Sequence, residues 1–262
     1  MLIFLLFQIS IISFGQNTIL WSVKDPSTNK TSYLLGTLHQ IGNSFVDSIP
    51  QIKKALKSSE LAIFETTNAG NAVSELMNLR KGNNDYKNNL KQSDLAYLDE
   101  ISSDWKVPVS KLSPMELLIK LQQTYVETQC GTVKPSDKWK HFEQYLKNLA
   151  TENSIKLYGL ETDSLQIELI NSLSKTKMTW KDVEKPIHTI IIDIKKHRNI
   201  NRNCQSAQEY MNMQFDYQFQ ETCGNKELRT RNESWIPQLA KILLKKIVLS
   251  LLVYSIFMDN VD

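Results

Sequence analysis

Three predicted strands end in side chains that can bind a metal ion or transfer a proton. The segment YLLGTLH (33–39) ends on His39, LAIFET (61–66) contains Glu65, and LYGLET (157–162) contains Glu161. In an open parallel sheet, ligands bind in the crevice outside the carboxyl ends of the strands. One imidazole and two carboxylates in such a crevice could hold a divalent cation, or act as general acid and base.

An alternative interpretation gives these residues no chemistry. Every strand must end, and a Glu-Thr pair after a strand can cap the helix that follows it. Gly36 is a separate signal, because a glycine inside a strand often permits close backbone approach. Here it would leave room beside His39.

The first elements predict a parallel crossover. Residues 19–25 and 31–38 are typical of two strands around a turn. Residues 48–59 indicate a helix that Ser48 caps, with Pro50 in its first turn. A short apolar strand follows at 60–66. This strand–helix–strand order implies parallel pairing.

Helices dominate the rest of the chain. Residues 113–123 begin with a capping box of Ser113 and Glu116. Strand character returns at 154–162, and the stretch 188–194 is ambiguous between strand and helix. The predicted fold class is therefore mixed α/β (α+β): a central sheet with a parallel crossover near the N-terminus, and a large helical portion.

Composition excludes several classes of function. Of the 262 residues, 41% are hydrophobic and 23% are charged, and the net charge is only +3. Since no long run of one charge sign occurs, we expect no nucleic-acid partner. The chain has no GxGxxG and no GxxxxGK[ST], so no nucleotide is expected. It also has no GxSxG, so the sequence does not support a serine hydrolase.

The first fifteen residues, 1–15, are uncharged and mostly Leu, Ile and Phe. They are typical of a signal peptide that is cleaved before Gln16 or Asn17, and they are too short to span a membrane. A buried first strand or helix is the alternative. A signal predicts a secreted or periplasmic protein.

The three cysteines are Cys130, Cys204 and Cys223, and none lies in a CxxC. A Cys204–Cys223 disulfide is mildly preferred, because both flank one predicted helical segment, but three free thiols fit about as well.

The other histidines carry weaker signals. His141 lies off the apolar stripe of its predicted helix, which indicates a solvated residue. His188 and His197 have no neighbours at metal-ligand spacing.

Four segments in order resemble the TraB/GumN family, which includes the Tiki metalloproteases: SYLLGTLH (32–39), ALKSSELAIFET (55–66), YGLETDSLQ (158–166) and RNESW (231–235). The resemblance implies a mixed α/β fold related to erythromycin esterases and ChaN proteins. It also implies an active centre with two Gly-x-x-His motifs, a glutamate and a divalent metal.

Carried onto this chain, the resemblance assigns His39 and Glu65 as ligands of Mn, Co or Zn. It assigns Glu65, Glu161, Arg231 and Asn232 to catalysis, and Gln166 to the segment that follows Glu161. A metal lowers the pKa of bound water, a carboxylate takes the proton, and an arginine fixes a carboxylate or an oxyanion. The alternative for Arg231 is an ion pair with Glu161 that only braces the fold.

The end of the chain departs from the family pattern. Relatives continue into a strand and a second Gly-x-x-His, but here no histidine follows His197. We therefore expect a family domain over 16–242 and an atypical tail over 243–262, truncated or frameshifted. The tail is expected to leave a neighbouring strand of the sheet unpaired.

The expected function is a secreted, metal-dependent hydrolase that acts on peptides or proteins, inactive if the second motif is essential. The alternative is a non-catalytic binding or regulatory protein on the same scaffold. A further interpretation places 247–257 weakly against a membrane surface.

Overall fold

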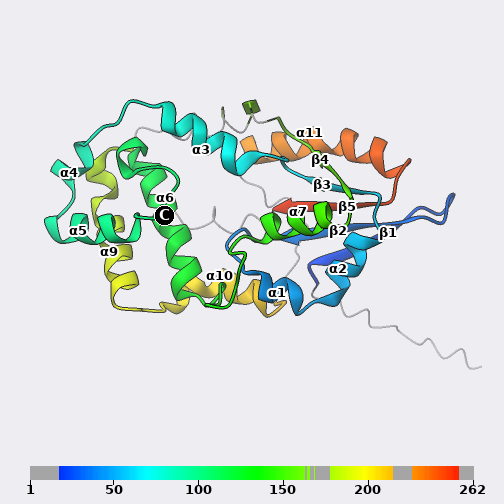
Figure 1. Ribbon diagram of the computed structural model, residues 1–262, viewed down its shortest axis with the longest axis horizontal. Coiled ribbons are helices and arrows are strands. Elements are labelled where there is room, and N and C mark those ends of the chain that lie inside the picture. The colour runs from blue at the N-terminus through cyan, green and yellow to red at the C-terminus, as the bar shows by residue number, and fades with distance from the viewer. Residues whose placement is uncertain (1–17, 163, 166–167, 169–177, 215–225, 254–262) are drawn as a thin grey trace, which may run out of the picture.

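The chain builds a sheet with helices on both faces and, beside it, a second group of helices (Figure 1). The computed structural model describes residues 18–162, 164–165, 168, 178–214 and 226–253. The predicted signal peptide, Gln166 and Cys223 lie outside these residues. The mixed α/β class is confirmed.

The sheet has five strands in the order β1-β2-β5-β3-β4. Their bounds are Leu20–Lys24 (β1), Thr31–Thr37 (β2), Leu61–Phe64 (β3), Lys156–Gly159 (β4) and Val248–Val253 (β5). β1 pairs antiparallel with β2, and the other three pairings are parallel. The carboxyl ends of β2, β3, β4 and β5 therefore meet at one edge of the sheet.

β5 is the central strand, which corrects the expectation that the tail leaves its neighbour unpaired. Leu249 lies opposite Tyr33 of β2 on one side and Ala62 of β3 on the other. Val248, Leu249, Ser250 and Leu251 are all buried. Part of the stretch considered for a membrane surface is thus inside the sheet. Among the described residues, no helix is long and apolar enough to cross a membrane.

The helices follow in chain order. They are α1 Asn43–Asp47, α2 Pro50–Lys57, α3 Ala69–Leu79, α4 Asp85–Asn89, α5 Gln92–Ile101, the 3-10 turn η1 Val109–Lys111, α6 Pro114–Gln129, α7 Phe142–Glu152, α9 Trp180–Lys195, α10 Asn201–Met211 and α11 Lys226–Leu243.

Local signals mark the starts of two of these helices. Pro50 opens α2, and the capping box of Ser113 and Glu116 opens α6. Ser48 does not cap α2, because a short helix, α1, precedes it. The Ser48 hydroxyl donates instead to the carbonyl of Phe45 at the end of α1. The ambiguous stretch 188–194 lies in α9 and is helical.

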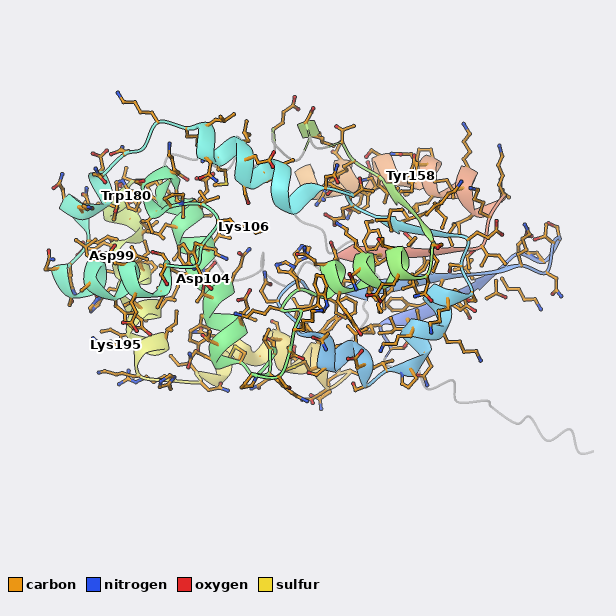
Figure 2. All side chains as sticks on the ribbon, in the orientation of Figure 1. Asp99, Asp104, Lys106, Tyr158, Trp180 and Lys195 are labelled. Carbon is orange, nitrogen blue, oxygen red and sulfur yellow. A yellow bond between two sulfur atoms is a disulfide. The ribbon has the colours of Figure 1, made fainter. Side chains whose placement is uncertain are left out.

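Three groups of buried side chains hold these parts together. One lies on the face of the sheet that α1, α2, α7 and α10 cover, and a smaller one joins the other face to Trp235 and its neighbours on α11. A third lies among α4, α5, α6 and α9. Figure 2 shows charged side chains such as Asp99 and Lys195 on the outside of this helical group.

The preferred disulfide was wrong. Cys130, at the end of α6, is bonded to Cys204 of α10, with the two Cα atoms 5.2 Å apart. Both cysteines are buried. The bond joins two helices that are 74 residues apart in the chain, and local spacing carries no signal for such a contact.

Candidate functional site

The three predicted residues at the strand ends lie at the carboxyl edge of the sheet. His39 lies two residues after β2, Glu65 directly after β3, and Glu161 two residues after β4. The segments after β3 and β4 stay paired beyond the strands, since the Glu161 amide donates to the Glu65 carbonyl at 2.8 Å. This pairing places the two glutamates side by side.

Gly159 allows the chain to make this close approach. A Cβ atom there would lie 3.2 Å from the Glu161 carbonyl oxygen and 3.3 Å from the Thr67 amide nitrogen, tighter than most real contacts. Gly36 has no such role beside His39. A Cβ at Gly36 would meet Trp21 at 3.7 Å, an ordinary van der Waals distance.

Arg231 of α11 binds both glutamates. Its Nε donates to Oε1 of Glu161, and its Nη2 donates to Oε2 of Glu161 at 3.2 Å and to Oε2 of Glu65. Trp235, one helical turn later, donates its indole N–H to Glu161 Oε1 at 3.1 Å. The guanidinium also lies over the Trp235 ring, 4.8 Å from its centroid.

The charged side chains of this cluster are largely buried. The side chains of Glu161, Glu65 and Arg231 are only 1%, 13% and 16% exposed. Burial raises the pKa of the Glu65 carboxyl, the positive charge of Arg231 offsets only part of this effect, and the nearby Glu143 raises it further. Glu65 therefore holds a proton more readily than an exposed glutamate does.

Asn232 is not part of the cluster. It is exposed on α11, and as the next residue after Arg231 it is turned about 100° around the helix axis.

A second group of polar side chains surrounds His39. Nδ1 of His39 is buried, has no hydrogen-bond partner among the residues that the structure describes, and lies 3.7 Å from Oε1 of Glu143. The hydroxyl of Thr37 donates to the same glutamate oxygen at 3.1 Å. The His141 ring lies 5.7 Å from the His39 ring, centroid to centroid. His141 and Glu143 come from the start of α7 and were missed by sequence reasoning.

His141 is exposed by surface area, as predicted, but it is not an isolated surface residue. Crowding by surrounding protein atoms, and next the charge of His39, lower the pKa of its imidazole. His141 is therefore a neutral imidazole beside His39.

His188 has a structural partner instead. Its Nδ1 lies 2.8 Å from the carboxylate of Asp94, a buried residue of α5. The pair joins α9 to α5, far along the chain from the strand ends.

The described residues do not fit the metal centre that the family resemblance implies. Among them, no group of three or more His, Cys, Asp or Glu side chains could hold a metal ion. Arg231 already binds the carboxylates of Glu65 and Glu161, and its positive charge opposes a cation there. Metal binding by His39 and Glu65 stays a prediction.

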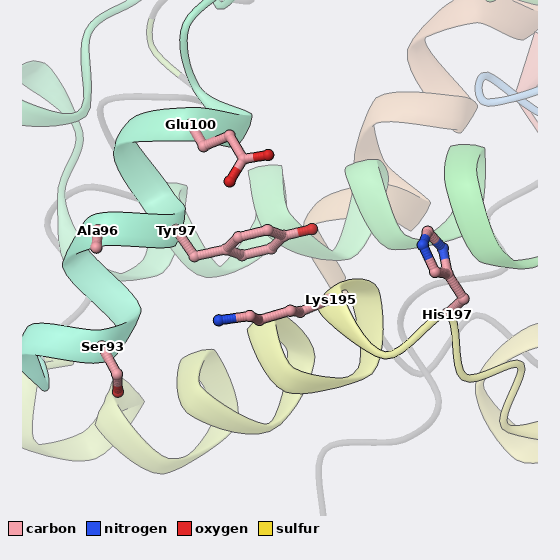
Figure 3. A pocket seen from close by; sticks show the side chains of 6 residues that line it. All are labelled: Ser93, Ala96, Tyr97, Glu100, Lys195 and His197. Carbon is pink, nitrogen blue, oxygen red and sulfur yellow. The ribbon is translucent and has the colours of Figure 1, made fainter.

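A surface cavity of about 470 Å³ lies elsewhere, between α5 and the end of α9 (Figure 3). Its lining consists of Ser93, Ala96, Tyr97, Glu100, Lys195 and His197. It includes none of the predicted site residues. We place the candidate site at the sheet edge, because the buried, charged and hydrogen-bonded groups converge there.

The chain matches the model of a known protein family. No curated protein and no solved structure is significantly similar to this chain. The model of the TraB/PrgY/gumN family matches residues 19–250. This range includes β1 to β4, the first half of β5 and every site residue described above. The chain belongs to the TraB/PrgY/gumN family.

Proposed function

We propose that this protein is a hydrolase that cleaves peptide bonds at the carboxyl edge of the sheet. The observation that carries the proposal is the pairing of a desolvated carboxylate, Glu65, with a fixed cation, Arg231, at the edge of the sheet where His39 also lies. These are the groups that water activation and charge stabilisation require.

In this mechanism Glu65 accepts a proton from water while the water oxygen bonds to the peptide carbonyl carbon. The guanidinium of Arg231 stabilises the negative charge that develops on the carbonyl oxygen. When the C–N bond breaks, the protonated Glu65 returns its proton to the leaving amine. Glu161 and Trp235 hold Arg231 in place through their hydrogen bonds and ring contact with it.

A peptide library read by mass spectrometry tests this function, with EDTA in one sample and Mn²⁺, Co²⁺ or Zn²⁺ in others. We expect cleavage that Glu65→Gln reduces by about 10²–10⁴-fold, the usual contribution of a general base. Glu152→Gln, an exposed residue at the far end of α7, is the matched control and should keep full activity. Equal activity of Glu65→Gln and wild type would contradict the mechanism.

Metal binding has its own test. Calorimetry with Mn²⁺ and Zn²⁺ on wild type and on His39→Ala measures whether His39 is a ligand. Binding that is lost in His39→Ala supports the predicted ligand. Equal binding by both proteins, or none by either, contradicts it.

A non-catalytic binding protein is the second candidate. It is favoured by the engagement of Arg231, whose hydrogen bonds to two glutamates match those of a structural brace. A peptide that binds without being cleaved in any of the buffers would support this candidate over the hydrolase.

We also propose that the protein is secreted or periplasmic. The buried Cys130–Cys204 disulfide supports an oxidising compartment, and residues 1–15 have the composition of a signal peptide. Mass spectrometry of the protein from its native host should give an N-terminus near Gln16 or Asn17. An intact Met1 would contradict export by a cleaved signal.

A further inference from the structure

The first turn of α7 is hydrogen-bonded to His39. The amide of Phe142 donates to the carbonyl of His39 at 3.2 Å, which joins the start of the helix to the chain after β2. This contact brings Glu143, the next residue, beside the His39 ring. The Glu143 side chain is only 12% exposed, and the Thr37 hydroxyl fixes its Oε1 atom.

The ring nitrogen that faces Glu143 needs a partner. Within the described part of the chain, Nδ1 of His39 is buried without a hydrogen bond, and a buried polar group without a partner is costly. It lies 3.7 Å from Oε1 of Glu143, so a side-chain rotation that closes the gap by about 0.8 Å makes a hydrogen bond of ordinary length.

Electrostatics decides which nitrogen of a neutral His39 carries the proton. With the proton on Nδ1, the ring donates a charge-assisted hydrogen bond to the carboxylate. With the proton on Nε2, a lone pair of Nδ1 would point at a negatively charged oxygen, which is repulsive. The partner of one imidazole nitrogen thereby sets the state of the other.

We propose that Glu143 is a positioning residue that holds the proton of His39 on Nδ1, so that Nε2 keeps its lone pair free. An Nε2 lone pair can accept a proton or bind an electrophile, whereas an Nε2–H group cannot. The catalytic part of this inference rests on the proposed hydrolase function. The tautomer itself does not.

Glu143 also has a structural role to separate from this one. It lies in the first turn of α7, where a negative charge is favourable to the helix. A purely structural role would change stability without changing the His39 tautomer. The test therefore reads the tautomer directly.

The tautomer is measured from long-range ¹H–¹⁵N correlations of the imidazole rings. The chain has only four histidines, so His39→Gln assigns the His39 signals. The buffer contains EDTA and lies about two pH units above the ordinary histidine pKa of about 6.5. We expect protonated Nδ1 in the wild type and a shift toward protonated Nε2 in Glu143→Ala.

Two further variants keep the result interpretable. Glu152→Ala, on the same helix but away from His39, should leave the tautomer unchanged. Thr37→Val removes the hydrogen bond that fixes Glu143, and should shift the tautomer in the same direction to a smaller extent. Thr37→Val takes the place of Glu143→Ala in the tautomer measurement if Glu143→Ala does not fold. Protonated Nε2 in the wild type, or the wild-type tautomer in a folded Glu143→Ala, would overturn the proposal.

Kinetics then separates this inference from the proposed function. If peptides are cleaved, Glu143→Gln should lower kcat by about 10–100-fold, as losses of orienting partners do, and should change KM by less than about twofold. A protein with the expected tautomer and no hydrolysis would refute the hydrolase and leave the Glu143–His39 pairing intact. Full kcat in Glu143→Gln would refute its role in catalysis.

Discussion

Arg231 binds Glu161 through two nitrogens, with Nε on one carboxylate oxygen and Nη2 on the other. The two residues are 70 positions apart in the chain, so this contact fixes α11 to the segment that follows β4. The Glu161 side chain is 1% exposed, and its charge cannot be compensated by water if the arginine is removed. The pair therefore contributes to the fold whether or not it also serves catalysis.

Arg231→Met should lower the free energy of unfolding by about 3–5 kcal/mol, because it leaves buried carboxylates without their cation. Urea unfolding measures the loss. Lys241→Met, an exposed position on the same helix, should change stability by less than about 0.5 kcal/mol. A loss below about 1 kcal/mol for Arg231→Met would mean that the pair is solvated in solution.

Strand ends and helix starts could be predicted from the sequence because their signals are local. The apolar segments before His39 and Glu65, Pro50 at the start of α2 and the capping box at Ser113 each depend on neighbouring residues. The shared edge then followed from the rule that parallel strands have their carboxyl ends together.

The remaining site residues could not be predicted, because long-range contacts place them. Glu143 lies in a helix whose pattern indicates only a buried apolar face, and it is 104 positions further along the chain than His39. Trp235 lies in the RNESW segment that resembles the family, but its hydrogen bond to Glu161 could be recognised only from the folded structure. For the same reason, the apolar stretch at 248–253 gave no sign that β2 and β3 flank it.

The central position of β5 predicts slow amide exchange. Leu249, Ser250 and Leu251 lie in a strand that is paired on both sides, so their exchange should require global unfolding. The amides of β1, an edge strand, should exchange faster. Hydrogen–deuterium exchange read by NMR distinguishes the two strands. Fast exchange at 249–251 would contradict the sheet order.

The hydroxyl of Ser250 offers a second prediction within β5. Its Oγ atom is buried and has no hydrogen-bond partner in the described ranges of the chain. Ser250→Ala removes this group and leaves only a small cavity, so the free energy of unfolding should stay the same or rise by up to about 1 kcal/mol. Leu249→Ala, one residue away, should instead cost about 2–5 kcal/mol, because it leaves a larger cavity in the core. A loss above about 1 kcal/mol in Ser250→Ala would mean that the hydroxyl has a partner.

The Cys130–Cys204 bond predicts a specific response to reduction. The Cys130→Ala/Cys204→Ala variant should lose about 2–4 kcal/mol of unfolding free energy, because the unfolded chain gains freedom. Reductant should destabilise the wild type by a similar amount and should not affect the variant further. Peptide mapping under non-reducing conditions should join the Cys130 and Cys204 peptides. A Cys204–Cys223 link would contradict the structure.

The carboxylate of Asp47 predicts a dependence of stability on pH. Burial raises its pKa, but hydrogen bonds from Lys53, Tyr145 and Asn43 outweigh this effect, and the net pKa is lowered from 3.8. The Lys53 ammonium lies 2.6 Å from Oδ1, and the Tyr145 hydroxyl donates to the same atom at 2.6 Å. These contacts join α1 to α2 and α7.

Because the folded-state pKa lies below the unfolded one, the stabilisation is present above the unfolded pKa of 3.8 and is lost as pH falls through the folded value. The side chains of Asp47 and Lys53 are each 37% exposed, so solvent screening limits the contribution to about 1 kcal/mol. Asp47→Asn should therefore be less stable than wild type by about that amount at neutral pH. The difference should shrink as the wild-type carboxylate becomes protonated.

Urea unfolding of wild type and Asp47→Asn at a series of pH values, from neutral down to about pH 3, measures this difference. Asp99→Asn is the matched control, because Asp99 is an exposed aspartate on the outside of the helical group (Figure 2). Its difference from wild type should be small at every pH. If the Asp47→Asn difference stays constant over the whole range, the pKa of Asp47 is not lowered in the folded protein, and its contacts with Lys53 and Tyr145 do not depend on its charge.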